Sequence, residues 1–281
     1  MVDVLLDALI DTLKIVPFLY LSYLVLDFIE KKSSVYKLNF LFLKHLGPLF
    51  GALLGCIPQC GFSVIAASLY AQNGISVGTL VACFISTSDE ALPMFLSNPG
   101  EYRQLGLFLI CKIVIALIAG YLIDFVIHKQ VNDEDDFEIE VEGLCNCSSN
   151  SFVNALNKTA KTVFFIFLIN VILGIIIYFI GEDRLSALLA VHPYIQPVIA
   201  TIVGFIPNCA ISILMVQLYM LDALTFGSMI AGLCSGAGVG LAVLFKNNKN
   251  TKENWLIVLY IGIVAVMSGV LIDLLLKGVI G

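Results

Sequence analysis

Two stretches of this chain, Gly55-Cys-Ile-Pro-Gln-Cys60 and Gly204-Phe-Ile-Pro-Asn-Cys209, carry the same pattern 149 residues apart. Each copy sets a proline, an amide side chain and a cysteine into an otherwise apolar segment. Because proline removes a backbone donor and blocks the preceding helical turn, both copies predict an interrupted helix. A duplicated bundle with such a break in each copy is typical of secondary transporters that bind their substrate at mid-membrane.

The match extends without a gap over 55–94 against 204–243, and again over 120–124 against 269–273. It predicts an all-α polytopic membrane protein with two inverted-topology repeats of about five membrane helices, each with a Pro-broken segment. The expected units are a first repeat at 1–128, an acidic cytosolic linker at 129–153 and a second repeat at 154–281. Helices are expected near 8–29, 44–57, 61–72, 75–97 and 104–127, and near 155–180, 188–206, 210–221, 223–245 and 254–276. Whether the broken segments are re-entrant hairpins, short spans or one unwound helix stays open.

The composition agrees with a membrane protein, since 59% of the residues are hydrophobic and 13% are charged. Soluble domains carry about 25% charged residues. Apolar stretches of spanning length lie at 15–29, 104–127, 160–180 and 254–276. Lysine and arginine gather in the loops that an outside N-terminus would place in the cytosol, which favours the inverted arrangement. The chain has no basic face for nucleic acid, and no nucleotide fingerprint or other sign of a cofactor.

The linker 129–153 contains the acidic run 132–142 and the pair Cys145 and Cys147. A solvated cytosolic segment is the simplest interpretation of such a charge run. Collection of cations by the acids, or binding of a soft metal by the two thiols, are the alternatives.

The broken segments are the first candidate substrate site. Proline frees backbone carbonyl groups, the amides supply donors and acceptors, and ionised thiols prefer soft ions. A plain helix kink with packing cysteines is the alternative, but the repetition favours a substrate site. The predicted substrate-binding residues here are Cys56, Pro58, Gln59, Cys60, Pro207, Asn208 and Cys209.

The second candidate is Ser86-Thr-Ser-Asp-Glu90, in which two adjacent carboxylates interrupt an apolar helix. Such carboxylates usually face a cavity, a partner or a proton path, although a position at the outer interface would also be tolerated. The matching stretch 234–240 keeps a serine, loses both acids and is rich in glycine, which permits close backbone approach. Ser86, Ser88 and Ser235 are therefore added to the predicted substrate site. The predicted metal ligands are Cys60, Asp89, Glu90 and Cys209.

Lys112 lies in the middle of the apolar segment 104–127 and needs a partner within the membrane. Asp89 and Glu90 are candidates for that partner. The three residues together are the predicted coupling site: burial and mutual repulsion raise the proton affinity of one acid, so that cation binding expels a proton.

The segments 55–63, 86–90 and 206–209 resemble the hallmark segments of the ten-transmembrane heavy-metal exporter family, whose members are also labelled arsenic efflux proteins or manganese transporters. The resemblance spans both repeats. It implies ten helices and export of a metal or metalloid, and the family labels disagree about the substrate. We expect an integral protein of the cytoplasmic membrane of a prokaryote.

Three functions compete. A secondary exporter of a heavy-metal cation or metalloid is the leading hypothesis, driven by a proton gradient because no nucleotide site is present. An organic-anion carrier of the same architecture would hold its substrate at half-helix N-termini. A membrane-embedded redox enzyme using Cys56 and Cys60 is disfavoured, because no base lies nearby in the sequence, and we expect no enzyme activity. Substrate, direction, coupling ion and oligomeric state stay open.

Overall fold

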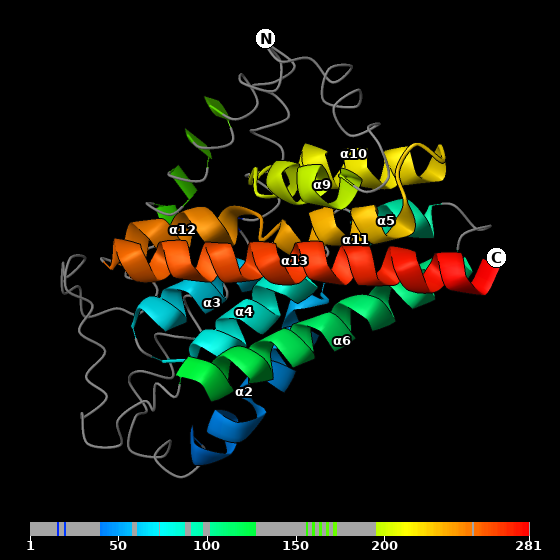
Figure 1. Cartoon of the computed structure of the whole chain (residues 1–281). Coiled ribbons are helices and arrows are strands. Elements are labelled where there is room, and N and C mark those ends of the chain that lie inside the picture. Colours follow the sequence, from blue (N-terminus) through cyan, green and yellow to red (C-terminus); the bar gives the residue numbers. More distant parts are fainter. Residues whose placement is uncertain are drawn as a thin grey trace, which may run out of the picture.

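The computed structural model describes residues 40–57, 61–72, 74–87, 91–97, 102–127, 195–248 and 250–280, with isolated positions at 16, 20, 156, 159–160, 163–164, 167–168 and 171–172 (Figure 1). All regular elements within these ranges are helices. The first half of the chain contributes α2 (Phe40–Gly55), α3 (Gly61–Ala71), α4 (Val77–Ser86), α5 (Ala91–Leu96) and α6 (Tyr102–Ile127). The second half contributes α9 (Gln196–Gly204), α10 (Cys209–Met220), α11 (Phe226–Ser235), α12 (Val239–Asn247) and α13 (Thr251–Ile280).

The two long helices, α6 and α13, confirm the spans expected at 104–127 and 254–276. Each exposes a row of large apolar side chains with helical spacing, as a surface facing lipid requires. The rows occupy matching positions of the two halves: Ile110, Val114, Ile118 and Phe125 on α6, and Leu259, Ile263, Met267 and Leu274 on α13. In Figure 1, α6 and α13 run in opposite directions across the molecule.

Four stretches of the described chain are long and apolar enough to cross a membrane: Val77–Leu96, Tyr102–Val126, Phe226–Asn247 and Thr251–Leu276. Shorter apolar helices are Leu46–Gly55, Gly61–Ala71 and Ile211–Met220. The expected spans at 15–29 and 160–180 lie almost wholly outside the described residues, as does the linker 129–153. This all-helical, apolar architecture is that of a polytopic membrane protein.

The spans expected at 75–97 and 223–245 are found at Val77–Leu96 and Phe226–Asn247, but each is interrupted. In the first, α4 ends at Ser86 and Thr87 has an extended backbone with φ −54° and ψ 125°. The hydroxyls of Ser86 and Thr87 both donate to the Cys83 carbonyl oxygen, which competes with helical hydrogen bonding. In the second, Gly238 separates α11 from α12 with φ 57° and ψ −147°, a conformation open essentially to glycine alone.

The core is organised around α4 and α11, which contact each other. Helix α4 packs between α2 and α6, and α11 packs in the same way between α9 and α13. Glycines allow the close approach. A Cβ atom at Gly55 would overlap the Ser86 hydroxyl and the Cys83 carbonyl, and one at Gly204 would overlap the Ser235 hydroxyl and the Gly232 carbonyl.

Two aspartates, Asp124 and Asp273, hold the N-termini of α4 and α11. Ser76 Oγ donates to Asp124 Oδ2 and the Gly78 amide donates to Asp124 Oδ1, both at 2.7 Å. Thr225 Oγ1 donates to Asp273 Oδ2 at 2.7 Å, and the Gly227 amide donates to Asp273 Oδ1 at 2.9 Å. The carboxylates satisfy amides that have no partner within their own helices, so both aspartates act as capping residues from a neighbouring helix.

The two halves also contact each other through their short helices. Helix α3 packs against α12, and α10 packs against α5, so a short helix of one half lies against a short helix of the other (Figure 1). Gly240 of α12 is held so closely that a Cβ atom there would lie 2.6 Å from the Ser63 Cβ of α3. The molecule is therefore one interleaved bundle rather than two adjacent units.

Candidate functional site

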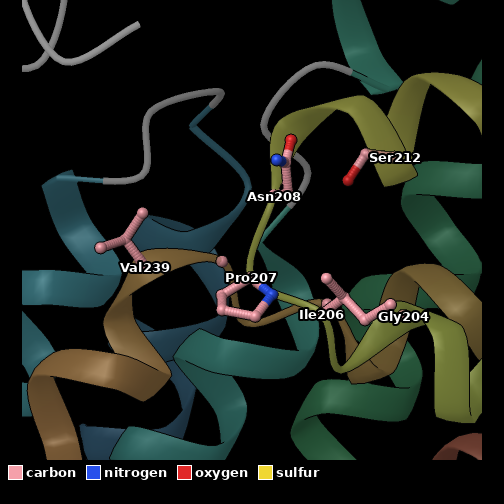
Figure 2. A pocket seen from close by; sticks show the side chains of 8 residues that line it. Gly204, Ile206, Pro207, Asn208, Ser212 and Val239 are labelled. Carbon is pink, nitrogen blue, oxygen red and sulfur yellow. The ribbon is translucent and has the colours of Figure 1, made fainter. Parts of the chain in front are cut away.

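A small cavity opens where the α9–α10 connection meets the α11–α12 connection (Figure 2). The cavity has a volume of about 10 Å³, roughly enough for one water molecule. Its lining residues are Gly204, Ile206, Pro207, Asn208, Ser212, Gly236, Gly238 and Val239. Figure 2 shows the Pro207 ring between Val239 of α12 on one side and Ile206 on the other.

The first wall of the cavity is the connection 205–208 between α9 and α10. Its backbone makes a tight turn about Pro207, in which the Asn208 amide donates to the Ile206 carbonyl at 2.8 Å. The Asn208 carbonyl in turn accepts from the Ile211 amide at 3.2 Å, which starts α10. Pro207 thus interrupts the helical hydrogen bonding and presents Asn208 at the start of the next helix.

The second wall is the glycine-rich connection between α11 and α12. Gly236 is the C-cap of α11 and Gly238 is the N-cap of α12. The Ala237 amide donates to the Ser235 carbonyl at 2.9 Å, which closes this turn. Two broken helices therefore meet at the cavity, and the start of α10 and of α12 lie there together with the ends of α9 and α11. Broken backbone is tolerated at membrane depth where protein or a polar cavity satisfies it.

Lys112 of α6 contacts the same end of α11 and is completely buried. Its ammonium group donates to the carbonyl oxygen of Thr87, at the end of α4, and to that of Leu233 in the last turn of α11, at 3.0 Å for the latter. The Phe108 ring lies 5.5 Å from the ammonium nitrogen. The C-terminal ends of helices carry a partial negative charge, and the C-terminal ends of α4 and α11 both contact this cation.

The serines predicted at the site lie at helix contacts. Ser86 and Ser235 are both fully buried. Ser86 Oγ donates to the Cys83 carbonyl, and Ser235 Oγ lies 2.9 Å from the carbonyl oxygens of Thr201 and Gly232. These hydroxyls thus satisfy carbonyl oxygens where α4 meets α2 and where α11 meets α9.

Four cysteines whose side chains the structure describes are thiols outside disulfide bonds: Cys56, Cys83, Cys111 and Cys234. Cys83 and Cys234 are buried, and Cys56 follows the last turn of α2 in a half-buried position. Lys112 is close enough to Cys56 and Cys234 to interact with them electrostatically. Within the part of the chain that the structure describes, no three His, Cys, Asp or Glu side chains gather into a metal site.

Six predicted site residues lie outside the described residues: Pro58, Gln59, Cys60, Ser88, Asp89 and Glu90. Among the others, the structure brings Pro207 and Asn208 into the cavity and places Cys209 at the first position of α10. The cavity adds Ser212, Gly236 and Gly238, which were not predicted as individual site residues. The repeat match over 55–94 and 204–243, which pairs Ser212 with Ser63, and the glycine-rich composition of 236–240 are the signals that could have found them.

The fold defines the class of this chain as an integral, α-helical membrane protein. A family model described as “Putative, 10TM heavy-metal exporter” matches residues 1–182 and 175–280. Because these matches cover nearly the whole sequence, the chain belongs to that family, and the resemblance noted in the sequence is confirmed. The description of this family is that of a membrane exporter. Neither a curated protein nor a solved structure was found to match the chain.

Proposed function

We propose that this protein is a secondary transporter that exports a heavy-metal cation or metalloid across the cytoplasmic membrane of a prokaryote. The observation that carries the proposal is the cavity at which the α9–α10 and α11–α12 breaks meet. Ligand sites of secondary transporters are built in this way, from discontinuous helices at a repeat interface. The family description supplies the substrate class.

The proposed architecture is two inverted repeats. Three observations support it: the Asp124 and Asp273 clamps occupy matching positions, the lipid-facing rows on α6 and α13 match, and these two helices run in opposite directions. Exchange of short helices between the halves would place one shared substrate site between them.

The proposed substrate site combines the described cavity with predicted residues of the first repeat. Asn208, Ser212 and the backbone at Gly236 and Gly238 offer oxygen and nitrogen atoms to a ligand. Asp89 and Glu90 would add carboxylates for a hard cation, and Cys60 and Cys209 would add thiolates for a soft one. The acid pair, as the proton-binding group, would couple export to the proton gradient.

An organic-anion carrier is the second candidate, because the N-termini of α10 and α12 both border the cavity. Helix N-termini carry a partial positive charge and favour anionic groups. A metalloid oxyanion would satisfy the same geometry and the family description together.

Uptake into proteoliposomes tests the proposal directly. The panel should contain Mn²⁺, Zn²⁺, Cd²⁺, arsenite and small organic anions, each with and without a pH gradient. Transport of a metal or of arsenite that stops when the gradient is dissipated supports the proposal. Transport of organic anions alone would establish the second candidate, and transport of nothing in the panel would contradict both.

Asn208→Ala links the transport to the cavity. Loss of one hydrogen bond to a charged ligand costs about 1.5–3 kcal/mol, so uptake should fall about tenfold or more. The matched control is Asn250→Ala, because Asn250 is exposed before α13 and lies outside the cavity lining. Equal uptake by the Asn208→Ala and Asn250→Ala variants would show that the cavity does not take part in transport.

Two further variants distinguish hard from soft substrates. If thiolates bind the substrate, replacing Cys60 and Cys209 with serine should abolish uptake and Asp89→Asn should have a milder effect. If the substrate is a hard cation, Asp89→Asn should abolish uptake and the two cysteine-to-serine changes should have the milder effect. Indifference of uptake to both changes would favour an organic substrate.

A further inference from the structure

The ammonium group of Lys112 is held by backbone, and by both halves of the molecule at once. Thr87 closes the end of α4 in the first half, and Leu233 lies in the last turn of α11 in the second half. Both carbonyl oxygens accept from the same nitrogen, and the side chain is completely buried. Carbonyl oxygens at the ends of broken helices are the ligands by which transporters hold small cations.

The chemistry of this carbonyl pair is that of a cation site. Carbonyl oxygens are hard ligands that suit an ammonium group, an alkali ion or a hard divalent ion. The two helix ends add partial negative charge, and the Phe108 ring face adds a weaker attraction. A free cation placed between the carbonyl groups would meet the same environment as the lysine nitrogen.

The matching position of the second half is apolar. Ile261 of α13 occupies the position that matches Lys112, and it is completely buried. Among the buried residues that the structure describes, the ammonium group of Lys112 therefore lies between two related helix ends and has no counterpart at the matching position. The carbonyl pair also adjoins the cavity, because Leu233 and the cavity residue Gly236 belong to the same end of α11. In sequence, Thr87 directly precedes the segment that carries Asp89 and Glu90.

We propose that Lys112 is a tethered cation that fills a cation site formed by the Thr87 and Leu233 carbonyl oxygens, and that a transported cation displaces it from this site. The inference rests on the proposed function for the identity of the moving ion. When the site holds Lys112, the two helix ends are neutralised without substrate. When the transported cation occupies the site, the ammonium group moves away from both carbonyl oxygens.

Displacement predicts that removal of the ammonium strengthens cation binding. The apparent dissociation constant of a ligand rises in proportion to the fraction of protein whose site is blocked. If Lys112 fills the site in about nine molecules of ten, Lys112→Gln should bind its cation about tenfold more tightly than wild type. Glutamine keeps a donor for one carbonyl group, and Lys112→Arg is the matched control because it keeps the charge.

The experiment is a thermal-shift titration of purified full-length protein in detergent with MnCl₂, NaCl and KCl, with choline chloride as the ionic-strength reference. Tighter binding of at least one of the three cations by Lys112→Gln, with Lys112→Arg near wild type, supports the proposal. Equal or weaker binding of all three by Lys112→Gln overturns it, because a merely structural lysine would lower stability without strengthening cation binding.

A second measurement uses the wild-type protein and does not depend on the folding of a variant. Saturating Mn²⁺, Na⁺ or K⁺ should increase the reductive methylation of Lys112, read by mass spectrometry, at least threefold over choline. Unchanged or reduced methylation with all three cations would contradict displacement. Failure of the proposed function is recognised separately, as absence of metal and arsenite uptake by wild-type proteoliposomes.

Discussion

The α4–α6 pair of the first half and the α11–α13 pair of the second half differ in a revealing way. Their clamps agree closely: the two hydrogen bonds to Asp124 measure 2.7 and 2.7 Å, and those to Asp273 measure 2.7 and 2.9 Å. Twelve residues before each aspartate, about three helical turns away, the same helices carry Lys112 in one half and Ile261 in the other. The two aspartate clamps have therefore stayed alike, while the buried position that could take part in chemistry is charged in one half and apolar in the other.

The ends of the two halves show the same contrast. Tyr70 donates a hydrogen bond to Glu253 at 2.5 Å. The matching Tyr219 packs its ring against Phe95 and Phe226, at centroid distances of 6.4 and 5.6 Å. A polar contact at one place thus corresponds to an aromatic cluster at the other.

The largest effect is expected where the shared frame is tightest. Gly55→Val and Gly204→Val should each prevent accumulation of folded protein, because the new Cβ would overlap a backbone carbonyl of α4 or α11. Fluorescence-detected size-exclusion chromatography of detergent extracts measures the outcome. Gly106→Val is the control, since nothing lies within 4 Å of a Cβ at Gly106. A monodisperse peak from only one of the two variants would show that the two glycine contacts are not equally required for folding.

A smaller and equal effect is expected at the clamps. Asp124→Ala and Asp273→Ala each remove hydrogen bonds to a carboxylate, which contribute about 1.5–3 kcal/mol. Each should therefore lower the melting temperature by about 3–12 °C, at roughly 2–4 °C per kcal/mol. Thermal melts of the two purified variants provide the measurement. Shifts that differ more than twofold would show that the two clamps are alike in geometry and unlike in strength.

The smallest effect sharpens the difference between the ends. The Tyr70–Glu253 hydrogen bond is partly exposed, so Tyr70→Phe and Glu253→Ala should each destabilise the protein by about 1 kcal/mol. The double variant should be no worse than Glu253→Ala alone, because both changes remove the same contact. Melting temperatures of the four proteins form the cycle. Strict additivity of the two single effects would mean that the hydrogen bond does not hold this end together.

Sequence reasoning reached the features that side chains encode. The long apolar runs identified α6 and α13, and the paired positions of Asp124 and Asp273 near helix ends indicated capping. It missed the breaks at Thr87 and at 236–238, because hydroxyl groups and glycines within an apolar run do not by themselves end a helix. It could not find the partners of Lys112 either. Backbone carbonyl oxygens have no letter in the sequence, so only the fold shows which of them face a buried cation.

The exchange of short helices between the halves has a consequence for synthesis. Helix α3 leaves the ribosome long before its partner α12, which follows about 170 residues later. At about 5–20 residues per second, this interval is roughly 8–35 s. During it, the α3 surface around Ser63 that will receive Gly240 is without its final neighbour. The first half must therefore remain in the bilayer without this contact at first. The packing of α3 against α12 begins only when α12 has been inserted.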